Sequence, residues 1–138
     1  MKVFYLSQSR LEWIEEGILD YEKRLKTKLK VCWYCYKDEK QLLKGLSKEK
    51  YCICLDEKGK IFDSEAFSRY LFKNFEKAGS RMCVVIGAAD GLPKALREKY
   101  PLLSLSPMTF PHHFVRLFFI EQVYRAFEIE KGSAYHKS

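Results

Sequence analysis

The wholly apolar run Met82–Ile86 constrains the fold most strongly, because a strand without polar alternation must be covered on both faces of a sheet. Four further short runs, rich in apolar and aromatic residues, are separated from it and from one another by helical stretches. Strand and helix thus alternate, which is typical of an α/β domain with a mainly parallel sheet and helices on both faces. The other predicted strands are Lys2–Leu6, Val31–Tyr36, Tyr51–Leu55 and Leu102–Leu105.

The helices are predicted from apolar periodicity and from signals at their ends. Ser9 and Glu12 have the spacing of a capping box, and apolar residues from Leu11 to Leu25 then keep helical spacing. Asp63 or Ser64 is expected to cap a helix that ends at Gly79. The remaining predictions are a weak helix over Gln41–Leu46, a turn over Asp56–Gly59 that ends the third strand, a short helix between Pro93 and Pro101, and a last helix over His112–Lys131 that stops at Gly132.

Length and composition limit the class of protein. With 138 residues, of which 47% are hydrophobic and 31% charged, residues 1–138 are predicted to form a single globular domain. Every apolar run is far shorter than a membrane span, and the N-terminus does not have the pattern of a signal peptide. We therefore expect a soluble cytoplasmic protein without a membrane partner.

The chain is basic, since 25 Lys and Arg face 18 Asp and Glu, for a net charge of +7. A surplus of this sign favours a polyanionic partner. The densest basic cluster spans residues 23–30. It is either a nucleic-acid contact or a solvated helix end whose cations complement the helix dipole.

Five cysteines without a secretory signal argue against a disulfide framework. Cys32 and Cys35 have the C-x-x-C spacing of redox and zinc sites, and Cys52 with Cys54 could complete a zinc set. All of them, with Cys83, lie in runs typical of strands, where positions 32 and 35 face opposite sides of the sheet. The sequence therefore favours small core residues over a metal site.

Ligands in open α/β sheets bind beyond the carboxyl ends of strands. Three loops qualify, those after Leu55, Ile86 and Leu105. The second loop, Gly87–Gly91, has neither the glycine spacing of a dinucleotide-binding turn nor the Gly-Lys-Ser/Thr of a P-loop. The third holds two prolines, which fix the backbone and leave carbonyl groups without matching donors, so it is suited to gripping a flat polar group by main-chain contacts.

Four motifs follow one another in the last third of the chain. They are Ile86-Gly87-x-x-x-Gly91-Leu92, Leu105-Ser-x-Met-Thr-Phe-Pro-His112-x-x-x-Arg116, Glu121-Gln-Val-Tyr124-Arg125-Ala126 and Tyr135-His136-Lys137. In order and spacing they resemble the ribosomal RNA large subunit methyltransferase H family, small SPOUT-class enzymes that methylate N3 of a pseudouridine in 23S ribosomal RNA. The likeness is close from about residue 82 to the end and looser upstream.

This resemblance implies a C-terminal trefoil knot, S-adenosylmethionine as cofactor and a homodimer. It also implies that the partner is 23S ribosomal RNA or the assembled ribosome, and not DNA. The implied cofactor contacts lie in the three loops chosen above, at Leu55, Gly87, Leu105, Ser106, Pro107, Met108, Thr109 and Phe110. A last helix carrying Phe114, Phe118, Phe119 and Phe127 is also consistent with a homodimer, because one small sheet cannot cover so much apolar surface.

The chain departs from the family at three places. Gly87-Ala88 stands where a Gly-Gly pair is usual, Leu6-Ser7-Gln8 stands where Val-Gly-Lys is usual, and the stretch between the second and third strands is shorter. The methyl group of Ala88 would lie beside the cofactor. The alternative function is therefore a catalytically silent RNA- or ribosome-binding module with the same fold.

Two candidate catalytic residues lie at the start of the last helix. His112 is expected to act as a base or phosphate contact, with a capping histidine as the alternative, and the adjacent His113 is expected at the surface. Arg116 follows one turn later on the same face, suited to a phosphate or to negative charge that develops on the substrate.

Three further candidates lie near the C-terminus. Arg125 follows Glu121 by four residues, so an intrahelical salt bridge is the alternative to a functional role. Tyr135 and His136 belong to a short tail, where an aromatic residue has no structural reason to be. We expect this tail to dock, with Tyr135 stacking on a base over the partner subunit's cofactor.

Overall fold

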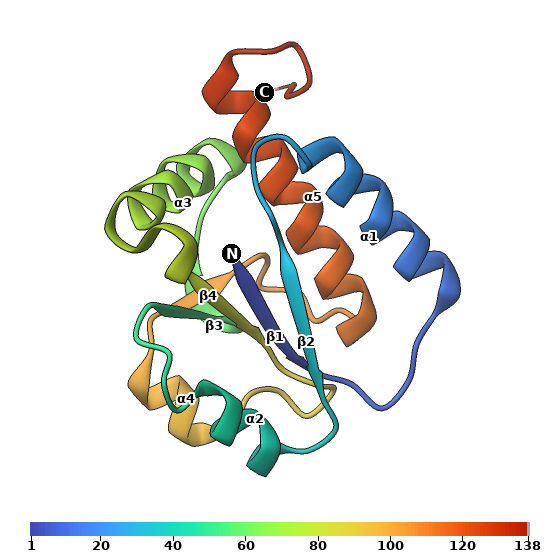
Figure 1. Cartoon of the computed structure of the whole chain (residues 1–138), viewed down its shortest axis with the longest axis vertical. Helices are drawn as coiled ribbons and strands as arrows, with labels where there is room; N and C mark the ends of the chain where they lie inside the picture. The colour runs from blue at the N-terminus through green and yellow to red at the C-terminus, as the bar shows by residue number, and fades with distance from the viewer. Residues whose placement is uncertain (138) are drawn as a thin grey trace.

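The computed structural model describes residues 1–137. In chain order the strands are β1 (Lys2–Leu6), β2 (Cys32–Tyr36), β3 (Cys52–Ile61), β4 (Cys83–Ile86) and β5 (Leu102–Ser104). The helices are α1 (Glu12–Leu25), α2 (Glu39–Leu46), α3 (Ser64–Ala78), α4 (Lys94–Lys99) and α5 (His112–Lys131), with a 3-10 turn over Gly79–Arg81. Figure 1 shows three layers, in which the sheet lies between α1, α3 and α5 on one face and α2 and α4 on the other.

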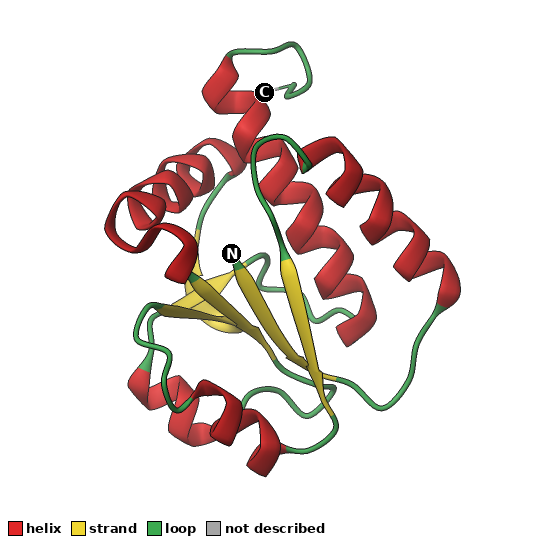
Figure 2. Ribbon diagram, in the orientation of Figure 1, coloured by secondary structure: helices red, strands yellow, loops and turns green. Residues whose placement is uncertain are grey.

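The five strands pair in parallel in the order β2-β1-β4-β3-β5, which confirms the α/β class with helices on both faces (Figure 2). The central strand β4 is buried along its whole length, as the apolar run Met82–Ile86 predicts. Val84 and Ile86 pack toward α1, α3 and α5, whereas Cys83 and Val85 pack toward α2 and α4. The trefoil knot stays a prediction.

The main helix ends follow the signals in the sequence. Asp63 caps α3 by accepting a hydrogen bond from the amide of Ala66 at 2.7 Å, and the helix ends at Gly79. α5 spans His112–Lys131 as predicted, and Gly132 closes it in the left-handed conformation with φ 77°. Across residues 1–137 no helix has both the length and the hydropathy of a membrane span.

The predicted capping box at Ser9 is wrong. α1 begins at Glu12, its N-cap is Leu11, and no side chain caps its first turn. The hydroxyl of Ser9 instead lies 3.0 Å from Nε2 of His113 in α5. The Ser9 hydroxyl therefore contacts a residue far along the chain and not the first turn of α1, where the local pattern placed it.

The predicted strand end at Asp56–Gly59 is also wrong, because β3 continues through it. The pairing of β3 with β5 shifts register between Leu55 and Lys60, so the turn residues form an irregularity inside the strand. The local turn chemistry is present, since Oδ1 of Asp56 accepts from the amide of Lys58 at 2.8 Å. Pairing with β5 keeps the segment in the sheet despite that turn.

The cysteines divide according to strand position. Cys52, Cys54 and Cys83 lie on inner strands and are buried, as predicted. β2 is an edge strand, and there Cys35 is exposed and Cys32 half-buried, so the prediction that these two are core residues is wrong. Within residues 1–137 no group of three His, Cys, Asp or Glu side chains could hold a metal ion.

Gly59 is expected to be essential to the β3–β5 contact. A Cβ at this position would lie 2.6 Å from the carbonyl carbon of Leu102 and 2.7 Å from the amide nitrogen of Leu103. Since backbone cannot move aside as a side chain can, Gly59→Ala should lower the free energy of unfolding by about 2 kcal/mol in urea titrations. Lys60→Ala, on the exposed side of the same strand, is the control, and equal stability of the two variants would contradict the close approach.

Candidate functional site

The three loops selected from the sequence surround one cavity at the carboxyl edge of the sheet, with a volume of about 280 Å³. This volume is near the lower end of small-molecule pockets, about 300–1,000 Å³. Of the predicted cofactor residues only Pro107 is absent from the cavity wall, which includes Leu55, Gly87, Leu105, Ser106, Met108, Thr109 and Phe110.

The loop after β4 turns back sharply against the cavity. A Cβ on Gly87 would lie 2.6 Å from the backbone of Gly91, so only glycine fits there. The amide of Gly91 donates to the carbonyl of Ala88 at 2.9 Å and closes the turn. The cavity wall on this side is therefore largely backbone.

Hydrogen bonds also hold the proline loop. Ser104 Oγ donates to the carbonyl of Ser106 at 2.8 Å, and Ser106 Oγ accepts from the amide of Met108 at 3.0 Å. Thr109 Oγ1 donates to Oε2 of Glu57 at 2.7 Å, which ties the loop to the irregular part of β3. The two segments on this side of the cavity are thus joined to each other.

The cavity wall carries charge of both signs that sequence reasoning did not assign to it. Asp56, Glu57 and Asp90 contribute carboxylates, and Lys58 and Arg97 contribute cations. Asp56 and Glu57 had been assigned only to a turn. Their position directly after the buried residue Leu55, at the carboxyl end of a strand, was the signal that could have found them.

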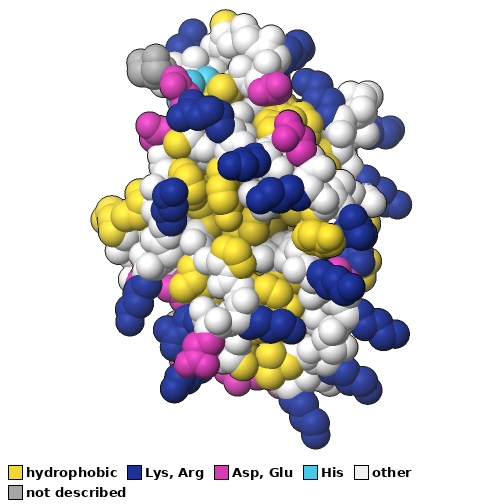
Figure 3. Space-filling view, turned by 90° about the vertical axis from the view of Figure 1, so that its left-hand side faces the viewer, with side chains coloured by type: hydrophobic (Ala, Val, Ile, Leu, Met, Phe, Trp, Pro, Cys, Tyr) yellow, Lys and Arg dark blue, Asp and Glu magenta, His cyan; other side chains and the backbone are white. Residues whose placement is uncertain are grey.

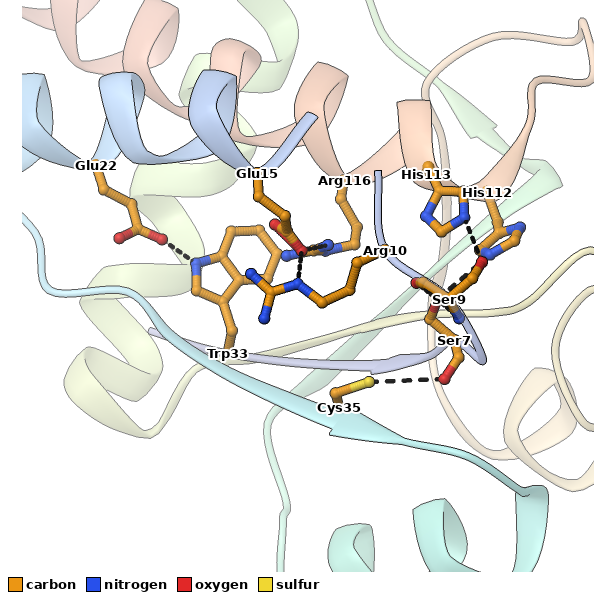
Figure 4. A network of polar contacts seen from close by, with 10 residues as sticks. All are labelled: Ser7, Ser9, Arg10, Glu15, Glu22, Trp33, Cys35, His112, His113 and Arg116. Carbon is orange, nitrogen blue, oxygen red and sulfur yellow. Dashed lines mark hydrogen bonds and ion pairs between the residues drawn. The ribbon is translucent and has the colours of Figure 1, made fainter. Parts of the chain in front are cut away.

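His112 lies at the edge of the cavity, at the first residue of α5 (Figure 4). Its Nε2 is 3.5 Å from Oγ of Ser7, in the loop after β1. The Ser7 hydroxyl donates to the carbonyl of Ser9 at 2.7 Å, so its oxygen faces the histidine as an acceptor. This arrangement favours the tautomer with the proton on Nε2 and a free lone pair on Nδ1.

The pKa of His112 is lowered from its usual value, mainly by burial and further by the neighbouring His113 and Arg116. The ring is therefore neutral at pH 7 and able to accept a proton.

His113 is buried, with 8% of its surface exposed, so the prediction that it lies at the surface is wrong. Its Nε2 is bonded to Ser9, and its ring lies 4.0 Å from that of His112, centroid to centroid. Ser7 and Ser9, two positions apart, thus each contact one of the two histidines. Through these contacts the first loop of the chain fixes the start of the last helix.

Arg116 lies outside the cavity wall. Its side chain is 6% exposed, and its Nη1 pairs with Oε1 of Glu15 in α1 at 2.8 Å. The guanidinium lies 4.8 Å from the ring centroid of Trp33 (Figure 4). It also lies 4.0 Å from the ring centroid of Tyr5. The structure therefore gives Arg116 partners of its own between α1 and the sheet and does not bring it to His112's cavity.

The tail docks on the C-terminal half of its own α5. Tyr135 donates its hydroxyl to Glu121 at 3.1 Å, and the guanidinium of Arg125 lies 4.8 Å from the centroid of its ring. His136 Nδ1 is 3.2 Å from Nη1 of Arg125. The salt bridge anticipated between Arg125 and Glu121 is present at 2.6 Å, and hydrogen bonding to this carboxylate raises the pKa of the guanidinium.

The five predicted catalytic residues thus lie at three places within one chain: His112 at the cavity, Arg116 beside Glu15, and Arg125 with the tail residues Tyr135 and His136. Arg125 follows His112 by thirteen positions of continuous helix, which corresponds to about 20 Å along its axis. Glu121, beside Arg125, lines a second hollow on the α3 side of α5, together with Phe62 and Phe118.

Comparison with known proteins decides the family. A family model described as "Predicted SPOUT methyltransferase" matches residues 1–136. Ribosomal RNA large subunit methyltransferase H of Protochlamydia amoebophila is 43% identical over 137 residues, which cover 99% of this chain and 98% of that protein. The chain belongs to the SPOUT methyltransferases.

Other relatives in the SPOUT methyltransferase family cover the chain equally well. Proteins with the name ribosomal RNA large subunit methyltransferase H from Pelobacter propionicus and Prochlorococcus marinus are 32% and 34% identical. The alignments cover 99% and 100% of this chain and 98% and 96% of those proteins. The resemblance drawn from the four sequence motifs is therefore confirmed.

Two of the departures from the family pattern lie at the site. Ala88 is part of the cavity wall, but its side chain also packs against the apolar cluster beneath α2 and α4. Ser7 supplies the hydroxyl that contacts His112. Sequence reasoning treated Ser7 only as a departure, because a contact across 105 positions leaves no local signal.

Arg116→Leu tests whether the buried ion pair is structural. Removing the guanidinium leaves the carboxylate of Glu15 without its buried partner, so the free energy of unfolding should fall by about 3 kcal/mol in urea titrations. Arg10→Leu is a matched control, because Arg10 reaches the same carboxylate at 3.7 Å but is 79% exposed. It should cost less than about 0.5 kcal/mol. Unchanged stability of the Arg116 variant would refute a structural role.

Proposed function

We propose that this protein transfers a methyl group from S-adenosylmethionine to N3 of a pseudouridine in 23S ribosomal RNA. The relatives are named as methyltransferases of large-subunit ribosomal RNA, which supports the RNA class of the substrate. The observation that carries the proposal is the convergence of three strand-end loops on one cavity with the neutral His112 at its edge. An enzyme with this substrate works where ribosomes are, in the cytoplasm.

The cavity has the chemistry that this cofactor requires. When bound, S-adenosylmethionine supplies a methyl group activated by a sulfonium cation. Carboxylates of Asp56, Glu57 and Asp90 in the wall suit its positive charges, and apolar side chains such as Ile86 and Val115 suit its adenine. Main-chain groups of the loops at Gly87 and Ser106 offer donors and acceptors for its polar edges.

The chain's own contribution is to position the substrate and to remove one proton. N3–H of pseudouridine is a weakly acidic imide, so its nitrogen attacks well only after deprotonation. His112 is neutral at pH 7, and the Ser7 contact leaves its Nδ1 free to accept that proton. No metal is required, because the sulfonium already activates the leaving group.

We also propose that the active site combines residues of two subunits in a homodimer. In one chain Arg125, Tyr135 and His136 lie about 20 Å along α5 from His112, too far for action on one base. Figure 3 shows apolar side chains gathered across the middle of one face, with Lys and Arg around them. The hollow lined by Phe62, Phe110 and Phe118 supplies an apolar surface for association.

The decisive experiment combines cofactor binding with product mapping. Calorimetry should detect S-adenosylmethionine binding to the purified protein. Methyl transfer to intact ribosomes and to free 23S ribosomal RNA should then yield one N3-methylpseudouridine, located by mass spectrometry of nuclease fragments. Absence of cofactor binding would favour the catalytically silent module instead.

His112→Asn tests the proposed base. The rate of methyl transfer should fall by about 10²–10⁴-fold, the usual contribution of a general base, while calorimetric cofactor affinity stays within a few-fold. In the unmodified enzyme, kcat/KM should fall as pH drops through the lowered pKa of His112, below the usual value of about 6.5. This acid limb should be absent in the variant, and an unchanged pH profile would exclude His112 as the base.

Mixed dimers test the composite site. Deleting residues 134–138 should leave cofactor binding nearly intact, yet reduce methyl transfer by orders of magnitude through lost positioning. Thr109→Pro should abolish cofactor binding, because it distorts the proline loop and removes the bond to Glu57. Mixing the two inactive variants should restore part of the activity. Activity in the tail deletion alone would show that the tail is dispensable.

A further inference from the structure

The α2 helix carries a row of lysines that the fold does not use. Lys40, Lys44 and Lys48 follow one another at intervals of four, and all three are exposed. Ser47 keeps helical angles, so the row continues past the end of the helix. Within residues 1–137 none of the three lysines makes an ion pair. Like charges at this spacing repel one another and destabilise a helix, so folding alone does not favour the row.

Acidic groups near this row are already engaged or lie at its start. Asp38 accepts a hydrogen bond from the amide of Gln41 as the cap of α2. Glu49 pairs with Lys2 at 2.7 Å. Glu39, in the first turn of α2, is the remaining acidic neighbour on this helix. The row therefore keeps a net positive charge.

Two aromatic side chains of β2 lie on the same face of the sheet as this helix. Tyr34 and Tyr36 stack on Phe4 of β1, with ring centroids 4.9 Å and 5.9 Å from it. Tyr34 is 40% exposed on the edge strand. Phe4 belongs to the apolar cluster that α2 covers, so both tyrosines are on the α2 side of the sheet.

Tyr36 packs against α2, and the two line one groove. Its wall includes Gln41, Lys44 and Lys48, together with Gly45, where a Cβ would collide with the tyrosine hydroxyl. The groove thus combines an aromatic ring and two cations.

This groove starts at the edge of the sheet that also holds the proposed cofactor cavity. The carbonyl of Tyr36 accepts from the amide of Ser7 at 3.0 Å, and Ser7 in turn contacts His112. Gln8 Nε2 donates to the carbonyl of Lys37 at 2.8 Å, which joins the loops after β1 and β2. A strand with its target base at His112 could therefore continue along α2 without leaving the surface.

We infer that Lys40, Lys44, Lys48, Tyr34 and Tyr36, the β2–α2 surface, bind a single-stranded RNA segment that flanks the methylated nucleotide. The lysines neutralise phosphates and the tyrosines stack on bases. Single-stranded RNA fits better than a duplex, because stacking on a protein ring requires a base that is free of its own helix. This inference rests on the proposed function, because the RNA is the substrate of that site.

The test compares two triple variants with equal loss of charge. Lys40, Lys44 and Lys48 are changed together to Gln in one, and Arg69, Lys73 and Lys77 in the other. The control cations are also exposed and spaced by four, but they lie on α3, which covers the opposite face of the sheet. Replacing lysines of a repulsive row by Gln should leave thermal unfolding unchanged or slightly raised.

Binding is measured by fluorescence anisotropy with a labelled single-stranded RNA of mixed sequence, at salt concentrations from about 50 to 200 mM. The α2 variant should bind about 10–100-fold more weakly near 100 mM salt. The slope of log K against log salt should become shallower by about 2, since each lost contact removes about 0.7. The control variant should remain within about threefold of the unmodified protein. Tyr34→Leu should weaken binding about tenfold and leave the slope unchanged.

Equal binding by the two triple variants would overturn the inference and leave the proposed function untouched, because cofactor calorimetry and product mapping test that separately. Binding of the same variants to intact ribosomes can be measured by co-sedimentation. An α2 variant that loses ribosome binding but keeps RNA binding would also overturn the inference, since the surface would then recognise a different part of the ribosome. If the unmodified protein fails to methylate but the α2 variant still loses RNA binding, the proposed activity fails and only the RNA-binding role of the β2–α2 surface stands.

Discussion

The packing of α5 across the sheet is the constraint on which the other parts of the site depend. Phe119, Ile120, Val123 and Ala126 have at most 1% of their surface exposed, in a cluster that joins α5 to α1, α3 and three inner strands. A packed helix of 20 residues behaves as a rod of about 30 Å. Fixing its middle therefore fixes both ends, with His112 at the cavity and Arg125 near the docked tail.

The buried cation Arg116 shows that a residue with the sequence pattern of a catalytic one can have its partners away from the cavity. Its spacing from His112 suggested a shared site, yet its charge is compensated by Glu15 and by the rings of Tyr5 and Trp33. Burial raises the pKa of Tyr5 to about 12, so this ring stays neutral beside the guanidinium. The arrangement links α5 to α1 and to the first two strands, although Nε of Arg116 is buried without a hydrogen-bond partner in residues 1–137.

Features encoded locally could be predicted from the sequence, and features set by distant contacts could not. The apolar run at Met82–Ile86, the cap at Asp63 and the stop at Gly132 each depend on a few adjacent residues, and each was predicted. The continuation of β3 depends on pairing with β5, about forty residues later, and that pairing prevailed over the turn signal at Asp56–Gly59. Ser9 failed as a cap for the same reason, because its partner lies in α5.

The residues of the candidate site also divide into those that the sequence could predict and those that depend on contacts far along the chain. The three loops followed from the rule that ligands bind beyond strand ends, and the position of Glu57 just after Leu55 fits the same rule. Ser7, in contrast, became visible only through its partner His112. Under the proposed mechanism the two ends of α5 have different roles. Three loops of one chain line the cavity, with His112 at its edge. The groups at the two ends of α5 can meet at one base only across a subunit boundary. Association of subunits would then control methyl transfer.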